Sequence, residues 1–208
     1  ALINLLALLG WNPGTEQELF SMEELCQAFS IDRVGKAGSK FDLEKAKWFN
    51  HQYLMKKPDT ELLTIYKSVL KENKVECTDA FALKVMNTIK ERVNFPSELW
   101  AQSSFFFKAP ESYDEKSVKD KWKENASSFL QLIIPQIEET ENMQAEFLKN
   151  KLSLFITEKQ FAMGVVMNAL RIALVGASTG PDLFAILEII GKEETVARIK
   201  KALETIKK

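Results

Sequence analysis

The sequence predicts an all-α protein with about ten helices in two packed bundles, and three observations support this fold class. Apolar residues recur at spacings of three and four through most of the chain, and no segment alternates with a period of two. Glycine is scarce, at 8 of 208 residues, or roughly 4% against a usual ~7%. With only 6 prolines as well, the chain has few tight turns, which favours long helices.

Composition and charge narrow the class of protein. The 208 residues, 46% of them hydrophobic and 27% charged, suffice for one large or two small domains with a substantial core. The formal charge of −1 excludes a positive field over the whole surface, the usual mark of a nucleic-acid-binding protein. The apolar start, Ala1–Leu9, lacks a preceding basic region and is about half the ~20 residues that a membrane span needs. We therefore expect neither a signal peptide nor a membrane protein.

The histidine and cysteine content argues against a metal site. His51 is the single histidine, and Cys26 and Cys77 lie far apart in the sequence with no partner ligands nearby. We expect no metal in the chain, and thiols that are buried or free in a reducing compartment, the cytoplasm.

Two helices are predicted before residue 40. The apolar residues 1–9 form the first, which ends at the breaker cluster of residues 10–14. Ser21 and Glu24 form a capping box, because the serine oxygen can accept a backbone N–H while the glutamate reaches back. The helix that follows places three apolar residues on one face: Met22, Leu25 and Phe29.

Three further helices are predicted between Asp42 and Pro96. Asp42 caps the first, which ends at Pro58, while Thr60 opens the second and Thr78 the third. The residues expected to face the core from these helices are Ala46, Phe49, Tyr53, Leu62, Leu63, Tyr66, Val69, Leu70, Ala82, Val85, Met86, Ile89 and Val93.

The helical periodicity weakens from Ser97 to about Lys116. The aromatic run Phe105–Phe107, Pro110 and a polar stretch indicate a linker over an aromatic cluster, and we place the main domain boundary here.

Helices resume in the C-terminal half. Residues 126–137 carry one apolar stripe with a kink expected at Pro135, and residues 143–152 follow at helical spacing. A second capping box, Thr157 to Gln160, predicts the start of a helix over residues 161–175.

The last segment has the clearest turn signals. Residues 176–181 predict a turn, with Pro181 suited to the first position of the next helix. Gly191 ends that helix, and a final helix runs to Ile206.

Residues alone give little support for catalysis. Adjacent carboxylates on a helix point about 100° apart and do not converge. His51 lacks an accompanying activated serine or cysteine, and the glycines at 176 and 180 lack the Lys-Ser/Thr of a phosphate loop. Basic residues cluster in two places: at Lys84, Lys90 and Arg92, and in residues 192–208, which contain six basic and three acidic residues. This pattern favours a helical binding or scaffolding module over an enzyme, which would need converging acids near His51.

Three stretches resemble a known family. Residues 1–14 with Glu18–Leu25 resemble the segment that follows the catalytic core of bacterial glutamyl-tRNA synthetases. Phe41–Leu54 is similar to the next block of that family, with its Lys-x-x-Trp-x-Asn-x-x-Tyr pattern. Leu170–Gly176, Gly180–Phe184 and Gly191–Arg198 are similar to its C-terminal signature. The blocks occur in family order and extend from one end of the chain to the other.

The resemblance implies an anticodon-binding region of a class I aminoacyl-tRNA synthetase. The implied parent joins glutamate to tRNA(Glu) using ATP and Mg, and its catalytic domain, with His-x-Gly-His and lysine-serine-lysine signatures, is expected upstream of Ala1. The chain itself is then expected to be inactive alone and without a cofactor. The expected partner is tRNA(Glu), with no DNA or membrane, and the expected state is a cytoplasmic monomer.

The resemblance also assigns a role to each part of the chain. Residues 1–57 would be a stem-contact segment, residues 58–110 a first helical anticodon-binding subdomain and residues 111–208 a second one. The candidate stem contacts are Lys45, Lys47, Trp48 and Asn50.

Four residues are implied as anticodon contacts. Arg92 and Arg171 match arginines on the anticodon side, and Pro181 and Leu183 match a turn whose leucine packs against a base. Gly180 stands where some members have threonine, so a side-chain contact expected there is lost. Arginine forks with an apolar stacking partner can read unstacked loop bases. The alternative is a helical protein-interaction module without RNA binding, and it would be favoured if Arg92, Arg171 and Leu183 were scattered or buried rather than on one exposed basic surface.

Overall fold

The computed structural model of the chain describes residues 1–35, 38 and 40–206, and this part is built from helices. The α-helices are α1 (Leu2–Gly10), α2 (Met22–Ala28), α3 (Leu43–Met55), α4 (Asp59–Glu72), α5 (Asp79–Ile89), α6 (Leu99–Ser103), α7 (Glu115–Lys121), α8 (Ala126–Glu138), α9 (Ala145–Glu158), α10 (Met163–Val175) and α11 (Leu183–Thr205). Four short 3₁₀ turns are η1 (Ile31–Arg33), η2 (Lys90–Arg92), η3 (Pro96–Glu98) and η4 (Ser104–Phe106). The described residues contain no strand beyond an isolated bridge between Trp11 and Val34, so the all-α prediction is confirmed.

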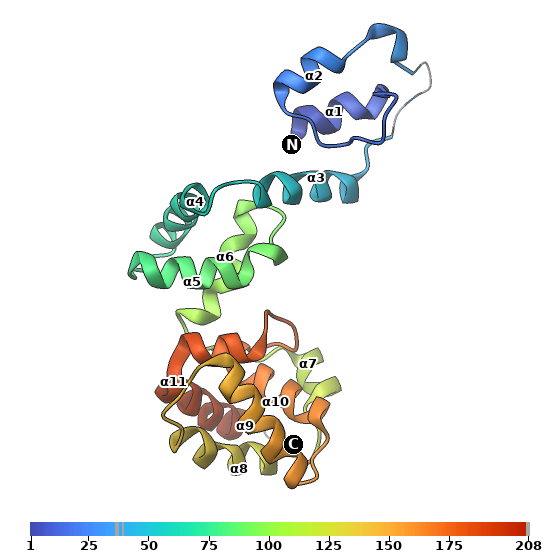
Figure 1. The fold of residues 1–208 in the computed structure, drawn as a ribbon. Helices are drawn as coiled ribbons and strands as arrows, with labels where there is room; N and C mark the ends of the chain where they lie inside the picture. The colour runs from blue at the N-terminus through green and yellow to red at the C-terminus, as the bar shows by residue number, and fades with distance from the viewer. Residues whose placement is uncertain (36–37, 39, 207–208) are drawn as a thin grey trace.

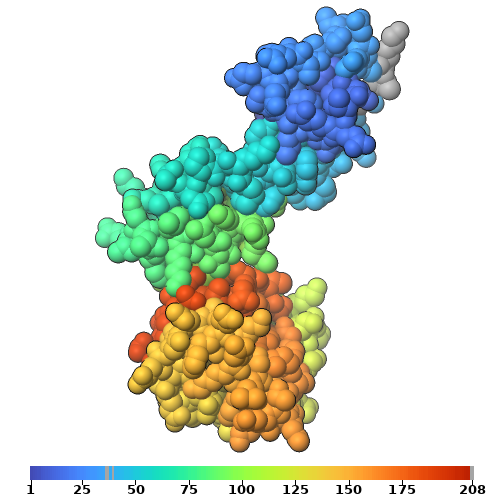
Figure 2. All heavy atoms as spheres, in the orientation of Figure 1, coloured from blue at the N-terminus to red at the C-terminus, as the bar shows by residue number. Residues whose placement is uncertain are grey.

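The molecule is elongated, with its parts in series. Figure 1 shows a unit containing α1 and α2 at one end, helices α4–α6 in the middle and the bundle α7–α11 at the other end, while α3 leads from the first to the second. The space-filling view in Figure 2 shows the same succession, with the N-terminal unit extending away from the rest. We call these the N-terminal unit (α1–α3), the first helical part (α4–η4) and the second helical part (α7–α11).

Polar contacts hold the N-terminal unit together around a small core. Asn4 is buried, its Nδ2 donates to the Glu18 carbonyl at 2.7 Å, and its Oδ1 accepts from the Phe20 N–H at 2.7 Å and from the Tyr53 hydroxyl at 2.6 Å. The predicted capping box at Ser21 is present, with the reciprocal Glu24 bond. This network connects three elements: helix α1, helix α3 and the segment that precedes α2.

Helix α3 connects the N-terminal unit to the first helical part. Asp42 caps it as predicted, accepting from two backbone N–H groups at 2.9 and 3.1 Å. Near its other end, the Nδ1 atom of His51 lies 2.9 Å from the Val93 carbonyl oxygen, and the amide of Asn50 donates to the Asn94 carbonyl. His51 thus fixes the loop that follows α5.

The prediction of an irregular linker from Ser97 to about Lys116 is wrong for much of that range. Residues 96–106 form η3, α6 and η4, and Leu99, Phe105 and Phe106 are buried. Helix α7 also starts at Glu115 within the stretch expected to be irregular. Such short turns change direction too often for one 3.6-residue period to show in the sequence.

Two start signals of the C-terminal half are also corrected. Thr157 lies inside α9, where its hydroxyl donates to the Ser153 carbonyl at 2.8 Å, and α10 begins only after Ala162. The apolar stripe of α9 continues through the buried Ile156, so the helix extends past the apparent cap. Pro181 precedes α11 rather than opening it, because the Asp182 carboxylate caps the helix by accepting from two N–H groups.

Helices α8 and α11 show how backbone breaks are accommodated. Helix α8 continues through Pro135 to Glu138. Helix α11 is interrupted at Gly191, whose φ of 80° and ψ of 176° are not helical, so the predicted end at this glycine is confirmed as a kink.

One hydrophobic core connects the two helical parts. It runs from Leu54 through helices α4–α6 and α7–α11 to Ile206, whereas the core of the N-terminal unit is a separate cluster of Trp11, Phe20 and Leu25. None of the helices in the described ranges is long and apolar enough to cross a membrane.

Candidate functional site

The turn between α10 and α11, residues 176–182, is held tightly against the start of the second helical part. Gly176 has a φ of 87°, which favours glycine, and a Cβ there would lie 3.0 Å from both Pro110 Cβ and the Ser112 carbonyl oxygen. The Asp114 N–H donates to the Gly176 carbonyl at 2.8 Å. The turn is therefore a rigid support for the side chains around it.

Arg171 lies across this turn. Its side chain is half-buried, and its Nη1 donates to the Pro181 carbonyl at 2.5 Å. A Cβ on Gly180 would lie 3.0 Å from the same Nη1 atom, so the absence of a side chain at Gly180 leaves room for the guanidinium. One donor of the five-donor fork is used by the turn, which fixes the plane of the group.

Arg171 and Arg92 come from different helical parts and act on each other. Burial lowers the pKa of Arg171, the Asp182 carboxylate opposes that shift, and the Arg92 cation lowers the pKa further. The Arg171 guanidinium therefore lies within electrostatic range of one cation, Arg92, and one anion, Asp182, which act on it in opposite directions.

Arg92 is the exposed member of the pair. It ends η2, directly after α5. Its neighbour Lys90 is paired with Asp59 at 3.1 Å, and Lys84, the other lysine of this stretch, is paired with Glu188 at 2.8 Å. The positive charge that faces solvent here is therefore concentrated on Arg92.

Pro181 and Leu183 do not lie on the exposed surface. Pro181 is buried, and Leu183 is 3% exposed. Because Asp182 caps α11, the first helical turn directs Leu183 into the core. Leu183 therefore does not share an exposed surface with the arginines, contrary to the expectation from the sequence. Pro181 takes part in the site through its carbonyl, which accepts a hydrogen bond from Arg171.

Two of the candidate stem contacts are lysines in surface ion pairs. Lys45 Nζ lies 2.6 Å from Glu18, and Lys47 Nζ lies 2.7 Å from Glu44. Glu44 also raises the pKa of Lys47 through this hydrogen bond. The Lys45–Glu18 pair is part-buried and the Lys47–Glu44 pair is exposed, and ion pairs near the surface contribute little to stability.

The other two candidates have different environments. Trp48 is 39% exposed and its ring meets Phe49 edge-on, with centroids 4.9 Å apart. Asn50 is occupied by its bond to the Asn94 carbonyl. Trp48 is thus the one that offers an open aromatic surface, and Asn50 has a structural contact.

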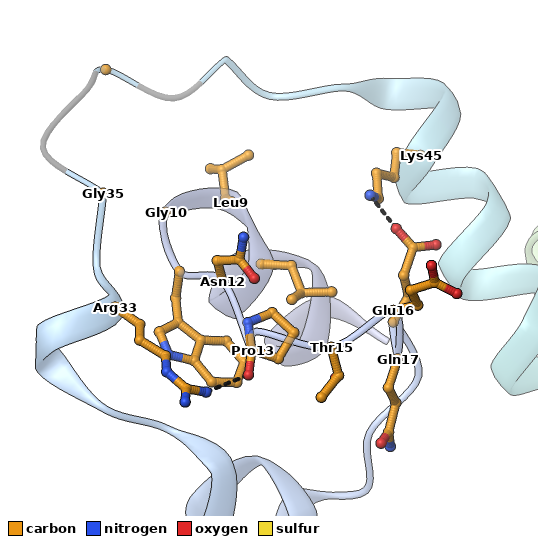
Figure 3. Close-up of a pocket in the computed structure, with 14 residues that line it drawn as sticks. Leu9, Gly10, Asn12, Pro13, Thr15, Glu16, Gln17, Arg33, Gly35 and Lys45 are labelled. Carbon is orange, nitrogen blue, oxygen red and sulfur yellow. Dashed lines mark hydrogen bonds and ion pairs between the residues drawn. The ribbon is translucent and has the colours of Figure 1, made fainter.

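A cavity of about 530 Å³ opens in the N-terminal unit between α1, the loop that follows it and the start of α3. Figure 3 shows Arg33 reaching Pro13 on one wall and Lys45 facing an acidic residue on the other. His51 is not among its lining residues. Within the described ranges, no three His, Cys, Asp or Glu side chains gather in a way that could hold a metal ion.

Sequence reasoning missed two residues that organise the site. Asp182 caps α11, and its carboxylate raises the pKa of Arg171. Its position directly after a proline-containing turn is a sequence signal for an N-cap. Arg198 is buried and bonds carbonyls of both helical parts, and nothing in its local pattern distinguishes it from an exposed helix cation.

Comparison with known families gives a match over most of the chain. The model of a family described as "Anticodon binding domain" matches residues 44–203. These residues include the first helical part, nearly all of the second and nearly all of α3.

Longer curated proteins are similar to the chain over its whole length. A glutamate–tRNA ligase of Porphyromonas gingivalis is 46% identical over 206 residues, which cover 99% of this chain and 41% of that protein. A glutamate–tRNA ligase of Flavobacterium johnsoniae is 47% identical with the same coverage. The chain thus spans about two-fifths of the length of these relatives.

Solved structures give the same result. The crystal structure of a glutamate tRNA ligase from Elizabethkingia meningosepticum in complex with its amino acid superimposes with a TM-score of 0.89 at 42% identity, covering 99% of this chain and 41% of that one. The glutamate-tRNA synthetase from Elizabethkingia anophelis superimposes with a TM-score of 0.85 at 42% identity, covering 98% of this chain and 40% of that one.

Proposed function

The chain belongs to the anticodon-binding domain family, and from this premise we propose that it recognises the anticodon and stem of tRNA(Glu) as the C-terminal part of a glutamate–tRNA ligase. The observation that carries the proposal is the placement of Arg171, which donates to the Pro181 carbonyl of a tight turn and lies within electrostatic range of the exposed Arg92. The family match does not favour the alternative, a helical protein-interaction module without RNA binding.

The chemistry of the two arginines suits single-stranded bases. Anticodon bases expose their Watson–Crick edges, and a guanidinium fork can bond to such an edge or stack on the base. Arg171 is fixed by the Pro181 carbonyl, while Arg92 is exposed and can adjust. By analogy with other complexes, each good base contact contributes about 1–3 kcal/mol of discrimination.

The three segments divide the work in this proposal. Residues 58–110 and 111–208 supply one arginine each to the anticodon site, and residues 1–57 contact the stem. There Lys45, Lys47 and Trp48 present ammonium groups and an aromatic surface, while Asn50 positions α3. The buried Pro181 and Leu183 act through the shape of the turn rather than through direct stacking.

In this proposal, catalysis takes place in the rest of the glutamate–tRNA ligase, outside this chain. There ATP and Mg would support the joining of glutamate to tRNA, and this chain supplies recognition alone. We place such a protein in the cytoplasm and expect this chain to act as a monomer.

The test is binding of an anticodon stem-loop of tRNA(Glu) to the chain and to its Arg171→Ala variant. We expect the variant to lose discrimination, by about tenfold for one base contact, against loops with a changed anticodon base. Lys149→Ala, on the exposed surface of α9, is the charge-matched control and should bind as the unchanged chain does. An equal loss for every anticodon sequence, with an unaltered circular dichroism spectrum, would refute a base-reading role.

The salt dependence of binding supplies a second criterion. A stem-loop held by a few lysine–phosphate contacts should show a modest negative slope of log affinity against log salt. A slope near zero would exclude backbone contacts.

A further inference from the structure

Arg198 is a charged side chain enclosed in the core. It is 3% exposed, in the second half of α11 beyond the kink at Gly191. Arginine is almost never buried to this extent unless its donors are paired. Its contacts therefore show what the residue does.

The guanidinium of Arg198 joins three elements. Nε donates to the Glu194 carboxylate at 2.7 Å, and Nη1 donates to the Phe105 carbonyl at 2.6 Å and to the Leu174 carbonyl at 2.8 Å. Phe105 lies in η4, the last element of the first helical part, and Leu174 lies in the last turn of α10 in the second. One planar group thus spans the joint between the two parts.

Each end of this bridge leads to one arginine of the proposed anticodon site. Leu174 is three residues, less than one turn, from Arg171 on α10. Phe105 belongs to the part whose α5 and η2 end at Arg92. A shift at the joint would therefore change the separation of the two guanidinium groups.

Two further polar contacts at or near the joint lie at the surface of the molecule. The Lys84–Glu188 pair joins α5 to α11 with side chains that are 49% and 30% exposed. Lys201 Nζ donates to the Pro110 carbonyl at 2.8 Å in an exposed setting. Exposed pairs contribute little and are screened by salt, whereas charge-assisted bonds in the core have strict geometry.

We propose that Arg198 is a positioning residue that fixes the first helical part against the second and so sets the geometry of Arg92 relative to Arg171 for anticodon discrimination. This inference rests on the proposed function. Lysine cannot replace it, because a single ammonium lacks the planar fork that reaches Glu194 and both carbonyls at once.

The first experiment measures the geometry without RNA. Spin labels are placed on the exposed Cys77, in the first part, and on Leu154→Cys, at a site 62% exposed on α9, in a Cys26→Ser background. Pulsed electron–electron double resonance measures the distance between the two labels. We expect Arg198→Met to shift or broaden the distribution of this distance, and Lys201→Met, the surface control, to leave it unchanged. An unchanged distribution for Arg198→Met overturns the proposal.

The second experiment measures recognition with the anticodon stem-loops. We expect Arg198→Met and Arg198→Lys to keep the helical circular dichroism signal but to lose about tenfold in the ratio of cognate to base-changed affinity. If Arg198→Met does not fold, Arg198→Lys provides the comparison. Unchanged discrimination in a folded Arg198 variant, while Arg171→Ala loses it, overturns the positioning role and leaves the proposed function intact. If Arg171→Ala and Arg92→Ala also retain full discrimination, it is the proposed function that fails, and the label distances still decide whether Arg198 fixes the joint.

Discussion

The N-terminal unit and the second helical part are held together in different ways. Among the described residues, the N-terminal unit has a small core cluster of Trp11, Phe20 and Leu25, and its α1 exposes Leu2 at 64% and Leu6 at 52%. The second part buries mainly apolar faces of its long helices, in a core shared with the first part. Hydrophobic burial thus stabilises one end of the molecule, and the polar network around Asn4 specifies the other.

The proposed anticodon site lies in the more continuously packed region of the molecule. Arg171 lies on α10 and Arg92 directly follows α5, and both helices pack into the shared core, so close packing positions the two backbones from which these side chains extend. The N-terminal unit, in contrast, leaves several large apolar side chains of α1 exposed, among them Leu2, Ile3 and Leu6.

The largest effect is expected in the core of the second part. Phe129 is 0% exposed and its ring lies 5.0 Å from that of Phe161, so Phe129→Ala should lower the free energy of unfolding by about 3–5 kcal/mol. Phe147→Ala, at a site 45% exposed, is the matched control and should cost less than about 0.5 kcal/mol. Urea unfolding followed by circular dichroism measures both, and equal losses would contradict the packing described for α8.

A smaller and local effect is expected in the N-terminal unit. Asn4→Ala removes a side chain that satisfies the Phe20 N–H and the Glu18 carbonyl, which should cost about 1–3 kcal/mol. Hydrogen exchange should then accelerate in α1 and α2 and remain unchanged in α8–α11. Acceleration throughout the chain would show that the two regions unfold together.

Replacing two glycines of the second part by alanine should change the stability of the chain in opposite directions. Gly176→Ala places a Cβ at positive φ and 3.0 Å from the Ser112 carbonyl, and should destabilise the chain by about 1–2 kcal/mol. Gly164, in the first turn of α10, has open space around it, so Gly164→Ala should stabilise the chain by up to about 1 kcal/mol. Thermal unfolding of both variants measures the difference, and a stable Gly176→Ala chain would refute the tight turn.

The smallest effect is expected at the joint, as a function of pH. The hydrogen bond from Lys84, followed by that from the Ala145 N–H, lowers the pKa of Glu188 below its ordinary value. The stabilisation is full above the ordinary value of 4.5 and is lost as the pH falls through the lowered pKa of the folded chain. Glu188→Gln should therefore reduce the loss of stability on acidification below about pH 4.5, as measured by urea unfolding. An identical pH profile for both chains would show that this pair contributes nothing to the joint.

The sequence predicted the elements whose signals are local. The caps at Ser21, Asp42 and Thr78 are all in place, because a cap is a contact between residues two or three apart. The same locality explains the failure at Thr157, where a cap-like pattern lies inside a helix that tertiary packing extends to Glu158.

The candidate site could be predicted only in part. The resemblance indicated Arg92 and Arg171, but the burial of Leu183 depends on how Asp182 orients the first turn of α11. The role of Arg198 depends on carbonyls 93 and 24 residues away along the chain. Contacts at such separations leave no periodic signal in the sequence.

A double-mutant cycle on Arg92→Ala and Arg171→Ala tests most directly whether these two arginines form one anticodon site. Binding of the cognate stem-loop is measured for the unchanged chain, both single variants and the double variant. Because both side chains would contact one RNA loop across a shared joint, we predict a coupling free energy of about 0.5–3 kcal/mol. Losses that add without coupling, in chains with unchanged helical content, would contradict a single site built by the two helical parts.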